Sequence, residues 1–542
     1  MLPPRPCIDM LATELLEVIL LYACAEIPLI LPPSRDNLYP HQHPCPALVL
    51  TWVCRRWRDI AIAKTELWAP RIEIQIREYE YKGYGEDDDP EYGARVANRT
   101  LAVLQCYLDR SRSAPLQVNV QNTLESEEDW RTSVGVSDIV QTICLAWPRW
   151  KTCILPGYLV HCLSATMCHT VPELLEAAEV PRTWFDIKVE LFRNAPRLRF
   201  WKGPINNAQD DVLPYAQLTE LHVGDFTPLY VVNFALSRCQ QLVRLTVCIC
   251  LDDDDDQGNV PTTLPYLESA KLTVDDPEIL VHILSTYTTP KLSRLELVGV
   301  GSTSSRTPSD SGAAGHVRYE SWPMEVFDDW LARSGDAWLG RADAPTTSFA
   351  APTPSLDTPS LPLDTLTLRN IAMPRADVVA ILERLPHLSA FTLEEDFSRC
   401  DPLPACAVDD TFLRRMTCAA DGTPASLLPR LKSLELRGLL RFDVGVLAEM
   451  LESRAGSGME VESGPRMESR LDTRIESLHI YGANGSTPDK IDESTATRLE
   501  AAMVRKNRLF FTSHAEETAT YTMNLDHFAD EVAALENSMA LD

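Results

Sequence analysis

The sequence lacks the short motifs by which several enzyme classes are recognised. Its 542 residues contain neither the nucleotide-binding pattern GxxxxGK[ST] nor the zinc-protease pattern HExxH, and neither GxSxG nor GxGxxG occurs. Acidic residues, serines and histidines are too frequent in a chain of this length for a catalytic pair to be chosen without geometry. We therefore expect a binding protein that is not an enzyme and needs no cofactor.

The cysteines lack a recognisable spacing. There are 15 of them, scattered without a repeated interval, which argues against a disulfide framework. The pairs His161-Cys162 and Cys168-His169 could be drawn as a metal cluster. Ligand pairs of structural zinc sites, however, usually lie roughly two to four residues apart, and the gap here is longer. We expect reduced thiols, most of them in the core, and no metal site.

Secretory and membrane-spanning segments are also missing. The opening MLPPRPCIDM has no apolar stretch of the kind found in a signal peptide. The apolar run from Leu15 to Leu31 is interrupted by Glu17, Glu26 and Pro28, so it is a poor membrane span. Together with reduced cysteines, this predicts residence in the cytoplasm, the nucleus or both, and no membrane partner.

Positive charge is scarce. The chain has 50 Lys+Arg against 78 Asp+Glu, a formal net charge of -28 at pH 7. A field of this sign repels DNA and RNA and attracts basic partners, so a nucleic-acid partner is disfavoured. The simpler interpretation of the excess of acidic residues is that their charge keeps a long chain soluble. The length allows about two to four domains.

Two apolar helical segments lie close together near the beginning of the sequence. LATELLEVILLYA (Leu11 to Ala23) predicts one helix, and LVLTWVCRRWRDIAIAKTELW (Leu48 to Trp68) predicts a second, amphipathic helical segment with two tryptophans. A unit of about seventy residues cannot bury this much apolar surface within itself. The surplus predicts a docking surface for another protein.

These segments resemble an F-box. The family pattern, roughly LPxELLxxIL and then VCRxWRxLA and LW, matches ELLEVIL, VCRRWRDIA and ELW within residues 8 to 76. The sequence departs from the pattern at Ala12, where proline is usual, and in an insertion over residues 25 to 45 that we expect to be a loop. The resemblance implies binding of a Skp-type adaptor and, through it, a cullin-based SCF ubiquitin ligase.

The resemblance also implies which residues bind the adaptor or pack beneath those that do. At the positions that match the family pattern these are Leu11, Leu15, Leu16, Ile19, Leu48, Val53, Cys54, Trp57, Leu67 and Trp68. The alternative is that most of these side chains form an internal core. Trp57 is the expected anchor, because an interface tryptophan commonly costs ~2–4 kcal/mol of binding when it is cut to alanine. The arginines at positions 55, 56 and 58 are expected at the rim, where they steer association.

A second pattern, apolar-x-x-apolar-x-apolar, recurs after residue 217. Its successive copies often lie about 25 residues apart, which is typical of leucine-rich repeats. The eight copies are LTELHV (218–223), LVRLTV (242–247), LESAKL (267–272), LSRLEL (292–297), LDTLTL (363–368), LSAFTL (388–393), LKSLEL (431–436) and IESLHI (475–480). The last three residues of each copy predict a short strand, and helix-period segments between the copies predict return helices and hence a parallel sheet.

The predicted fold is therefore α/β: a small all-α F-box module (1–70), then an irregular solenoid resembling leucine-rich repeats (71–483), then a cap or tail (484–542). The repeats depart from well-defined ones because the asparagine expected after the last strand leucine is missing. Residues 301–321 and 342–360 read as flexible insertions, and the helix predicted between them over 322–339 is either a return helix or a tethered interaction helix. The helix-then-strand order over 99–120 resembles F-box proteins of mushroom-type fungi.

Polar residues between the strand leucines should point away from the core and line a concave face where solenoids bind partners. The polar positions on this face include Glu220, His222, Glu435 and His479. The target-binding candidates are Arg244, Lys271, Arg294, Glu296, Arg369, Glu394, Arg437 and Tyr481. Their mixed charge suits a protein target, although for any single residue an ordinary solvated sheet face is the favoured alternative. We expect a substrate-recognition subunit of an SCF-type ubiquitin ligase; the alternative is a non-catalytic scaffold with a decayed F-box, acting outside a ligase.

Overall fold

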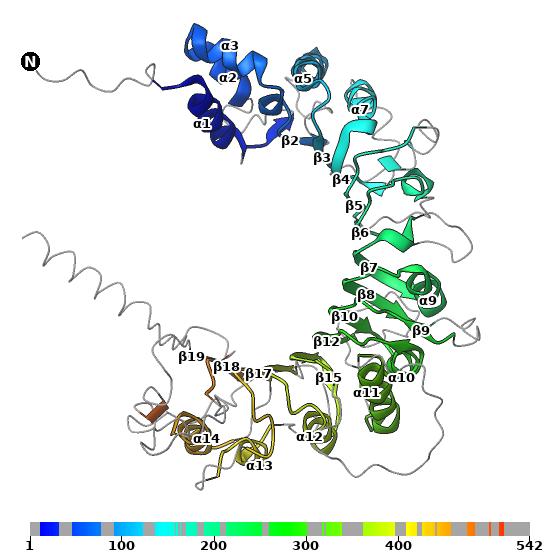
Figure 1. Ribbon diagram of the computed structural model, residues 1–542, viewed down its shortest axis with the longest axis vertical. Helices are drawn as coiled ribbons and strands as arrows, with labels where there is room; N and C mark the ends of the chain where they lie inside the picture. The colour runs from blue at the N-terminus through cyan, green and yellow to red at the C-terminus, as the bar shows by residue number, and fades with distance from the viewer. Residues whose placement is uncertain are drawn as a thin grey trace, which may run out of the picture. The chain divides into compact units, whose positions relative to one another are not determined.

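The computed structural model describes residues 11–25, 27–31, 46–76, 91–122, 136–157, 159–160, 163, 170–181, 189–205, 213–251, 260–300, 317–318, 321–338, 361–395, 408–419, 425–438, 442–456, 474–482, 498–499 and 509–513. The chain divides into two compact units. Unit 1 comprises residues 1–225 with 238–240, and unit 2 comprises residues 226–237 with 241–542. Figure 1 labels their elements.

Unit 1 opens with three short helices: α1 (Thr13–Ala25), α2 (Pro46–Val53) and α3 (Arg55–Ala63), followed by the 3-10 turn η2 (Thr65–Trp68). The break between α2 and α3 falls at Cys54, whose backbone is extended and whose Sγ accepts a hydrogen bond from the amide of Trp57. A residue of this kind starts a new helix by satisfying a free amide. The segment predicted over Leu48 to Trp68 is therefore two helices and a turn.

The strands of unit 1 form one parallel sheet in chain order: β1 (Leu29–Leu31), β2 (Arg71–Ile76), β3 (Leu116–Asn122), β4 (Trp150–Ile154), β5 (Ala177–Glu179), β6 (Phe200–Lys202) and β7 (Glu220–Pro228). β1 lies inside the insertion where a loop was expected, so that prediction is wrong for these three residues, and the module is not purely helical. The reason is pairing: Leu29 and Leu31 lie beside Ile72 and Ile74, with all four side chains buried.

Helices α5 (Glu91–Ser111) and α7 (Val136–Cys144) pack on each other beside this sheet. The predicted order of helix, turn and strand over 99–120 is confirmed by α5 and β3. Large aromatic rings fill the core next to the shorter strands, because Trp147 contacts Trp150 and Phe192, and Phe192 contacts Trp201, all edge to face with centroids 4.9–5.9 Å apart.

Unit 2 continues with parallel strands in the order β8 (Arg244–Cys250), β10 (Ser269–Val274), β12 (Arg294–Gly299), β14 (Thr365–Arg369), β16 (Ala390–Glu394), β17 (Ser433–Gly438), β18 (Ser477–Gly482) and β19 (Leu509–Ser513). All eight predicted strand segments, the first of them in β7, are strands of the structure. The α/β class and the parallel sheet are thus confirmed, and the architecture is consistent with a solenoid-like fold.

Return helices lie on one side of the unit 2 sheet (Figure 1): α9 (Leu229–Arg238), α10 (Pro277–Thr286), α11 (Met324–Trp338), α12 (Arg375–Glu383), α13 (Asp410–Arg415) and α14 (Val444–Gly456). Asp276 caps α10 by accepting a hydrogen bond from the Glu278 amide. α11 packs against α10 and buries Phe327 and Trp330, so it is a return helix and not a tethered one.

Two sequence interpretations need correction. Within the expected insertion 301–321, the described residues Val317–Arg318 form strand β13, which pairs with β15 (Ile371–Ala372); 342–360 lies outside the described residues. Strand β19 lies in the segment 484–542, where no strand was expected. In the same segment Arg498 binds both carboxylate oxygens of Glu452 in α14, so part of it docks on unit 2.

The core of unit 2 forms because every second strand residue faces the helices. One inward row contains Leu245, Ala270, Leu295, Leu366 and Phe391, neighbours in the sheet register. The alanine is the one small member of this row, and beside it the strands β8, β10 and β12 and the helices α9, α10 and α11 leave an apolar cavity of about 40 Å³. The opposite rows are polar and half-exposed.

Candidate protein-binding sites

Helix α1 carries two apolar stripes, and only one is covered. Leu16, Leu20 and Cys24, four residues apart, are buried. The other stripe consists of Leu15, Val18, Ile19 and Tyr22, whose exposed fractions are 57%, 63%, 45% and 84%. A helix that is apolar on both sides needs a partner on the second side.

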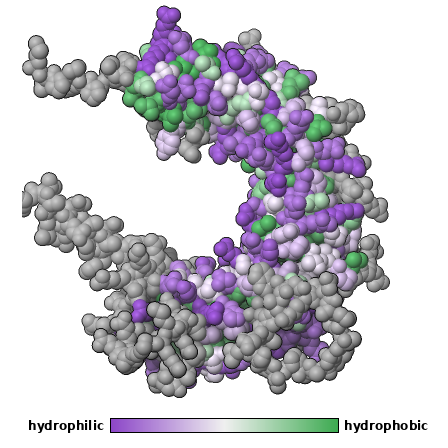
Figure 2. All heavy atoms as spheres, in the orientation of Figure 1, coloured by the Kyte–Doolittle hydropathy of each residue, from purple (hydrophilic) through white to green (hydrophobic). Residues whose placement is uncertain are grey.

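The next two helices extend this surface. Trp52 and Val53 at the end of α2 are 62% and 55% exposed, and Ile62 in α3 is 45% exposed. Figure 2 shows apolar residues gathering where Figure 1 places α1 to α3. We name the seven residues the apolar face: Leu15, Val18, Ile19, Tyr22, Trp52, Val53 and Ile62. Clustered exposure of large apolar side chains marks interaction surfaces on soluble proteins.

The apolar face is supported by a buried anchor in η2. Trp68 is fully buried and donates from Nε1 to the carbonyl of Ala61 in α3 at 2.6 Å. Its ring meets Tyr107 of α5 edge to face at 5.1 Å, and the Arg110 guanidinium lies over it at 4.2 Å. Lys64 also binds Glu17 at 3.1 Å and so ties the end of α3 to α1. The three helices are therefore held against the first long helix of the repeat region.

The structure separates the ten predicted adaptor-binding residues into three groups. Leu15, Ile19 and Val53 are exposed on the apolar face. Buried inside the chain are Leu16, Leu67 and Trp68, which act as support and leave no surface for a partner. Half-buried are Leu11, Leu48, Cys54 and Trp57.

The predicted adaptor-binding set missed Val18, Tyr22, Trp52 and Ile62, although Val18 lies within the recognised ELLEVIL segment. Helical spacing was the available signal for Tyr22, since it follows Leu15 by two turns of α1. Trp52 stands directly before the recognised VCRRW motif but outside it. Nothing in the pattern of α3 separates Ile62 from its buried neighbour Ala61.

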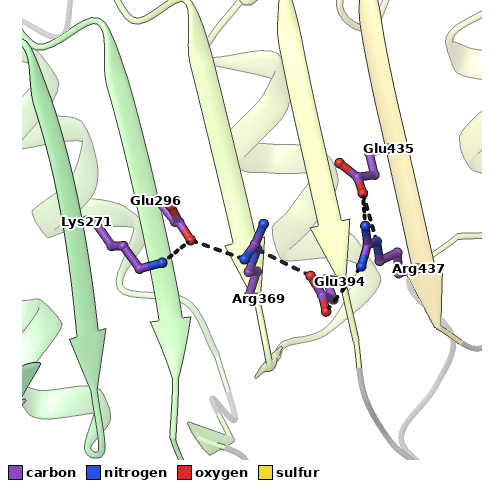
Figure 3. Close-up of polar contacts among 6 residues, drawn as sticks. All are labelled: Lys271, Glu296, Arg369, Glu394, Glu435 and Arg437. Atoms are coloured by element: carbon purple, nitrogen blue, oxygen red, sulfur yellow. Dashed lines mark hydrogen bonds and ion pairs between the residues drawn. The ribbon is translucent and has the colours of Figure 1, made fainter. Parts of the chain in front are cut away.

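The polar face of unit 2 carries a row of alternating charges, which we name the charge ladder (Figure 3). It consists of Lys271 in β10, Glu296 in β12, Arg369 in β14, Glu394 in β16, and Arg437 with Glu435 in β17. Lys271 binds Glu296 at 2.8 Å, and Arg369 lies 3.5 Å from Glu296 and 3.3 Å from Glu394. Arg437 lies 4.0 Å from Glu394 and 2.7 Å from Glu435. The ladder thus spans five strands with no net charge.

Sheet register explains which predicted target-binding residues meet. Arg369, Glu394, Arg437 and Tyr481 are neighbours in one row, and Lys271 and Glu296 are neighbours in the adjacent row. Arg244 and Arg294 both pair with Ser269, one further row away, and both are exposed. The structure brings five of the eight candidates into the ladder and leaves these two arginines outside, while Tyr481 is placed only by the pairing of its backbone with Arg437.

A buried acid lies directly beside the ladder. Glu395 follows Glu394 at the end of β16, where strand alternation turns its side chain inward, and it is only 4% exposed. Its amide donates to the carbonyl of Arg437 at 2.8 Å. Burial raises the pKa of the Glu395 carboxyl from 4.5 to about 8. The backbone there is close to Gly438, whose φ of +133° and approach to the Glu395 carbonyl leave no room for a Cβ.

A metal site finds no geometric support in the part of the chain that the structure describes. No group of three His, Cys, Asp or Glu side chains there is placed to hold a metal ion. The cysteine–histidine pairs at 161–162 and 168–169 lie outside the described residues. Among the helices that are described, none is both long enough and apolar enough to cross a membrane.

No protein-family model matches the sequence, and no curated protein matches it.

Proposed function

We propose that this chain is the substrate-recognition subunit of an SCF-type ubiquitin ligase, in which the α1–α3 region is an F-box that binds a Skp-type adaptor. The observation that carries the proposal is the apolar face, on the same helices that contain ELLEVIL and VCRRWRDIA. Removing apolar surface from water contributes ~25 cal/mol for each Å² in favour of a complex, and the freedom lost on association offsets part of this gain. Seven large side chains gathered on three short helices supply that surface.

Trp52 and Tyr22 are the strongest candidates for contact hot spots. Interface energy is concentrated in a few residues, with tryptophan and tyrosine enriched among them. Both side chains are more than half exposed, and α1, which carries Tyr22, buries Leu16 and Leu20 on its other stripe. A partner that covers them meets a preformed surface, which limits the entropy lost on binding.

The polar face of unit 2 is the proposed binding surface for the target. The described strands present charged residues of both signs, which favours selective recognition of a protein over general attraction of one charge. Holding a target on one surface while the ligase is held on another raises the effective concentration for ubiquitin transfer. The chain itself makes and breaks no bonds in this proposal, and it acts in the cytoplasm, the nucleus or both.

Affinity capture of the full chain from a eukaryotic lysate tests the proposal. The wild type is expected to retain a Skp-type adaptor and a cullin, and the double variant Leu15→Ala/Trp52→Ala is expected to lose both. Leu145→Ala is the matched control, because Leu145 is 73% exposed just beyond α7 and lies outside the apolar face. The variants should keep the wild-type circular dichroism spectrum, since the removed side chains are at the surface.

Two results would contradict the proposal. If the wild type retains neither adaptor nor cullin, the chain is a scaffold outside a ubiquitin ligase. If Leu145→Ala abolishes retention as fully as the double variant, the apolar face is not the contact surface.

A further inference from the structure

The middle of the charge ladder has unused hydrogen-bonding capacity. At one end of the ladder Lys271 hydrogen-bonds Glu296 at 2.8 Å, and at the other Arg437 hydrogen-bonds Glu435 at 2.7 Å. Arg369 approaches the carboxylates of Glu296 and Glu394 only as an ion pair, at 3.5 and 3.3 Å, and its guanidinium makes no hydrogen bond to either of them. Glu394 likewise has only ion-pair contacts with described residues, at 3.3 and 4.0 Å.

These two groups are accessible to a partner. The side chains of Arg369 and Glu394 are 39% and 27% exposed. Next to them in the sheet register lie Thr367 and Thr392, whose side chains are short. Figure 3 shows Arg369 and Glu394 lying side by side across neighbouring strands. A guanidinium presents donors in a fixed fork suited to a carboxylate, and a carboxylate accepts from lysine or arginine.

The spacing of the pair selects the conformation of the partner. Neighbouring strands lie ~4.8 Å apart, so charges on adjacent strands repeat at about that distance. Residues three or four apart on a helix lie ~5–6 Å apart. Side chains on one face of an extended segment lie roughly 6.6–6.8 Å apart, because they recur every second residue. A helix crossing the strands fits the ladder better than an extended peptide does.

Resting on the proposed function, we propose that the charge ladder recognises an α-helix of the target that carries an acidic and a basic residue three or four positions apart. The acidic residue accepts hydrogen bonds from Arg369, and the basic residue donates to Glu394. Alternation is the basis of selection: a helix with a run of one charge places like charges over Arg369 or over Glu394, and that juxtaposition is unfavourable.

Two labelled peptides of identical composition test this inference with the full-length chain. One is the helical peptide (EAAAK)4, in which Glu and Lys are four residues apart. The other, EAAAEEAAAEKAAAKKAAAK, has the same residues with its acids and bases in separate halves. By fluorescence anisotropy at low ionic strength, the wild type is expected to bind the alternating peptide about tenfold more tightly, equivalent to ~1.4 kcal/mol.

Substitution of the ladder provides the control. Arg369→Gln with Glu394→Gln should bind the two peptides equally, whereas Lys432→Gln, which removes the exposed 3.2 Å pair with Glu476, should keep the wild-type preference. Equal or absent binding of both peptides by the wild type, or an unchanged preference in the double variant, would overturn the inference.

Adaptor capture on the same preparations separates this inference from the proposed function. Loss of peptide discrimination with adaptor retained refutes the helix-recognition inference alone. Loss of adaptor with peptide discrimination retained refutes the proposed function and leaves the ladder as a helix-binding surface.

Discussion

Replacement of Glu395 by glutamine should stabilise unit 2 at alkaline pH and leave it unchanged in acid. Burial moves the pKa of this carboxyl from 4.5 to about 8, and no ion pair with a described residue offsets the cost. The folded state holds the proton of Glu395 more tightly than the unfolded state does. The contribution of this carboxyl to the free energy of unfolding is therefore fully present below about pH 4.5 and is lost as the pH rises to about 8. Glutamine has nearly the same shape as the protonated acid and can also donate a hydrogen bond, but it does not ionise when the pH rises.

The size of the effect follows from the same shift. Each tenfold change in a protonation equilibrium is worth ~1.4 kcal/mol, so the full shift sets an upper bound of roughly 5 kcal/mol. Local opening that admits water reduces this, and we expect about 2–3 kcal/mol at pH 8.5. Below pH 5 the difference between wild type and Glu395→Gln should be under ~0.5 kcal/mol.

Hydrogen exchange of backbone amides in β16 and β17 gives the local opening free energy at each pH. Glu394→Gln is the matched control, one residue away but on the solvated face, where losing a surface ion pair costs at most ~1 kcal/mol. A pH-independent difference, or an equal gain in Glu394→Gln, would show that Glu395 is not held uncharged by burial.

Three other changes have defined expectations. Ala270→Val should fill part of the 40 Å³ cavity and raise the free energy of unfolding by about 1 kcal/mol in urea titrations, since cavities cost ~24 cal/mol for each Å³; a lower value would mean that the site cannot accept the added methyl groups. Arg454→Met should destabilise unit 2 by roughly 2–4 kcal/mol in the same titration, because the buried guanidinium donates to the carbonyls of Met416, Leu427 and Leu428 at 2.8–3.3 Å; a neutral result would show that these carbonyls find other donors. Leu16→Ala should cost ~2–5 kcal/mol of stability and Leu15→Ala under ~0.5, the first being fully buried and the second 57% exposed; equal thermal shifts would contradict the assignment of the two stripes of α1.

Much of unit 2 could be predicted because each strand has a local alternation of apolar and polar residues in its own sequence. In LSRLEL the last leucines face inward as Leu295 and Leu297, and Glu296 between them faces the polar side. The same alternation placed Lys271, Arg369 and Glu394 on that side without any knowledge of the fold.

Pairing across long gaps could not be predicted in the same way. β12 and β14 are neighbours although the insertion and α11 separate them in sequence, so the contact of Glu296 with Arg369 depends on a register that no local pattern contains. β1 was missed for a related reason. Three apolar residues in a proline-rich stretch have too little periodicity to indicate a strand, and only the partner β2 makes them one.

The apolar face posed a different difficulty, because hydrophobicity alone does not tell which side of a helix is covered. Leu15 and Leu16 are identical in type and adjacent, yet one is exposed and the other is buried. The distinction arises from what η2 and α3 pack against, which is a tertiary property.

The pairing of β1 with β2 and the embedding of Trp68 against α5 have a practical consequence for anyone who divides this chain. A fragment cut after residue 76 would lose Tyr107 and Arg110 from around the indole and β3 from the outer edge of β2. The smallest fragment worth expressing therefore extends through β3, because only then do β2 and the Trp68 indole keep all the neighbours that hold α1 to α3 in place.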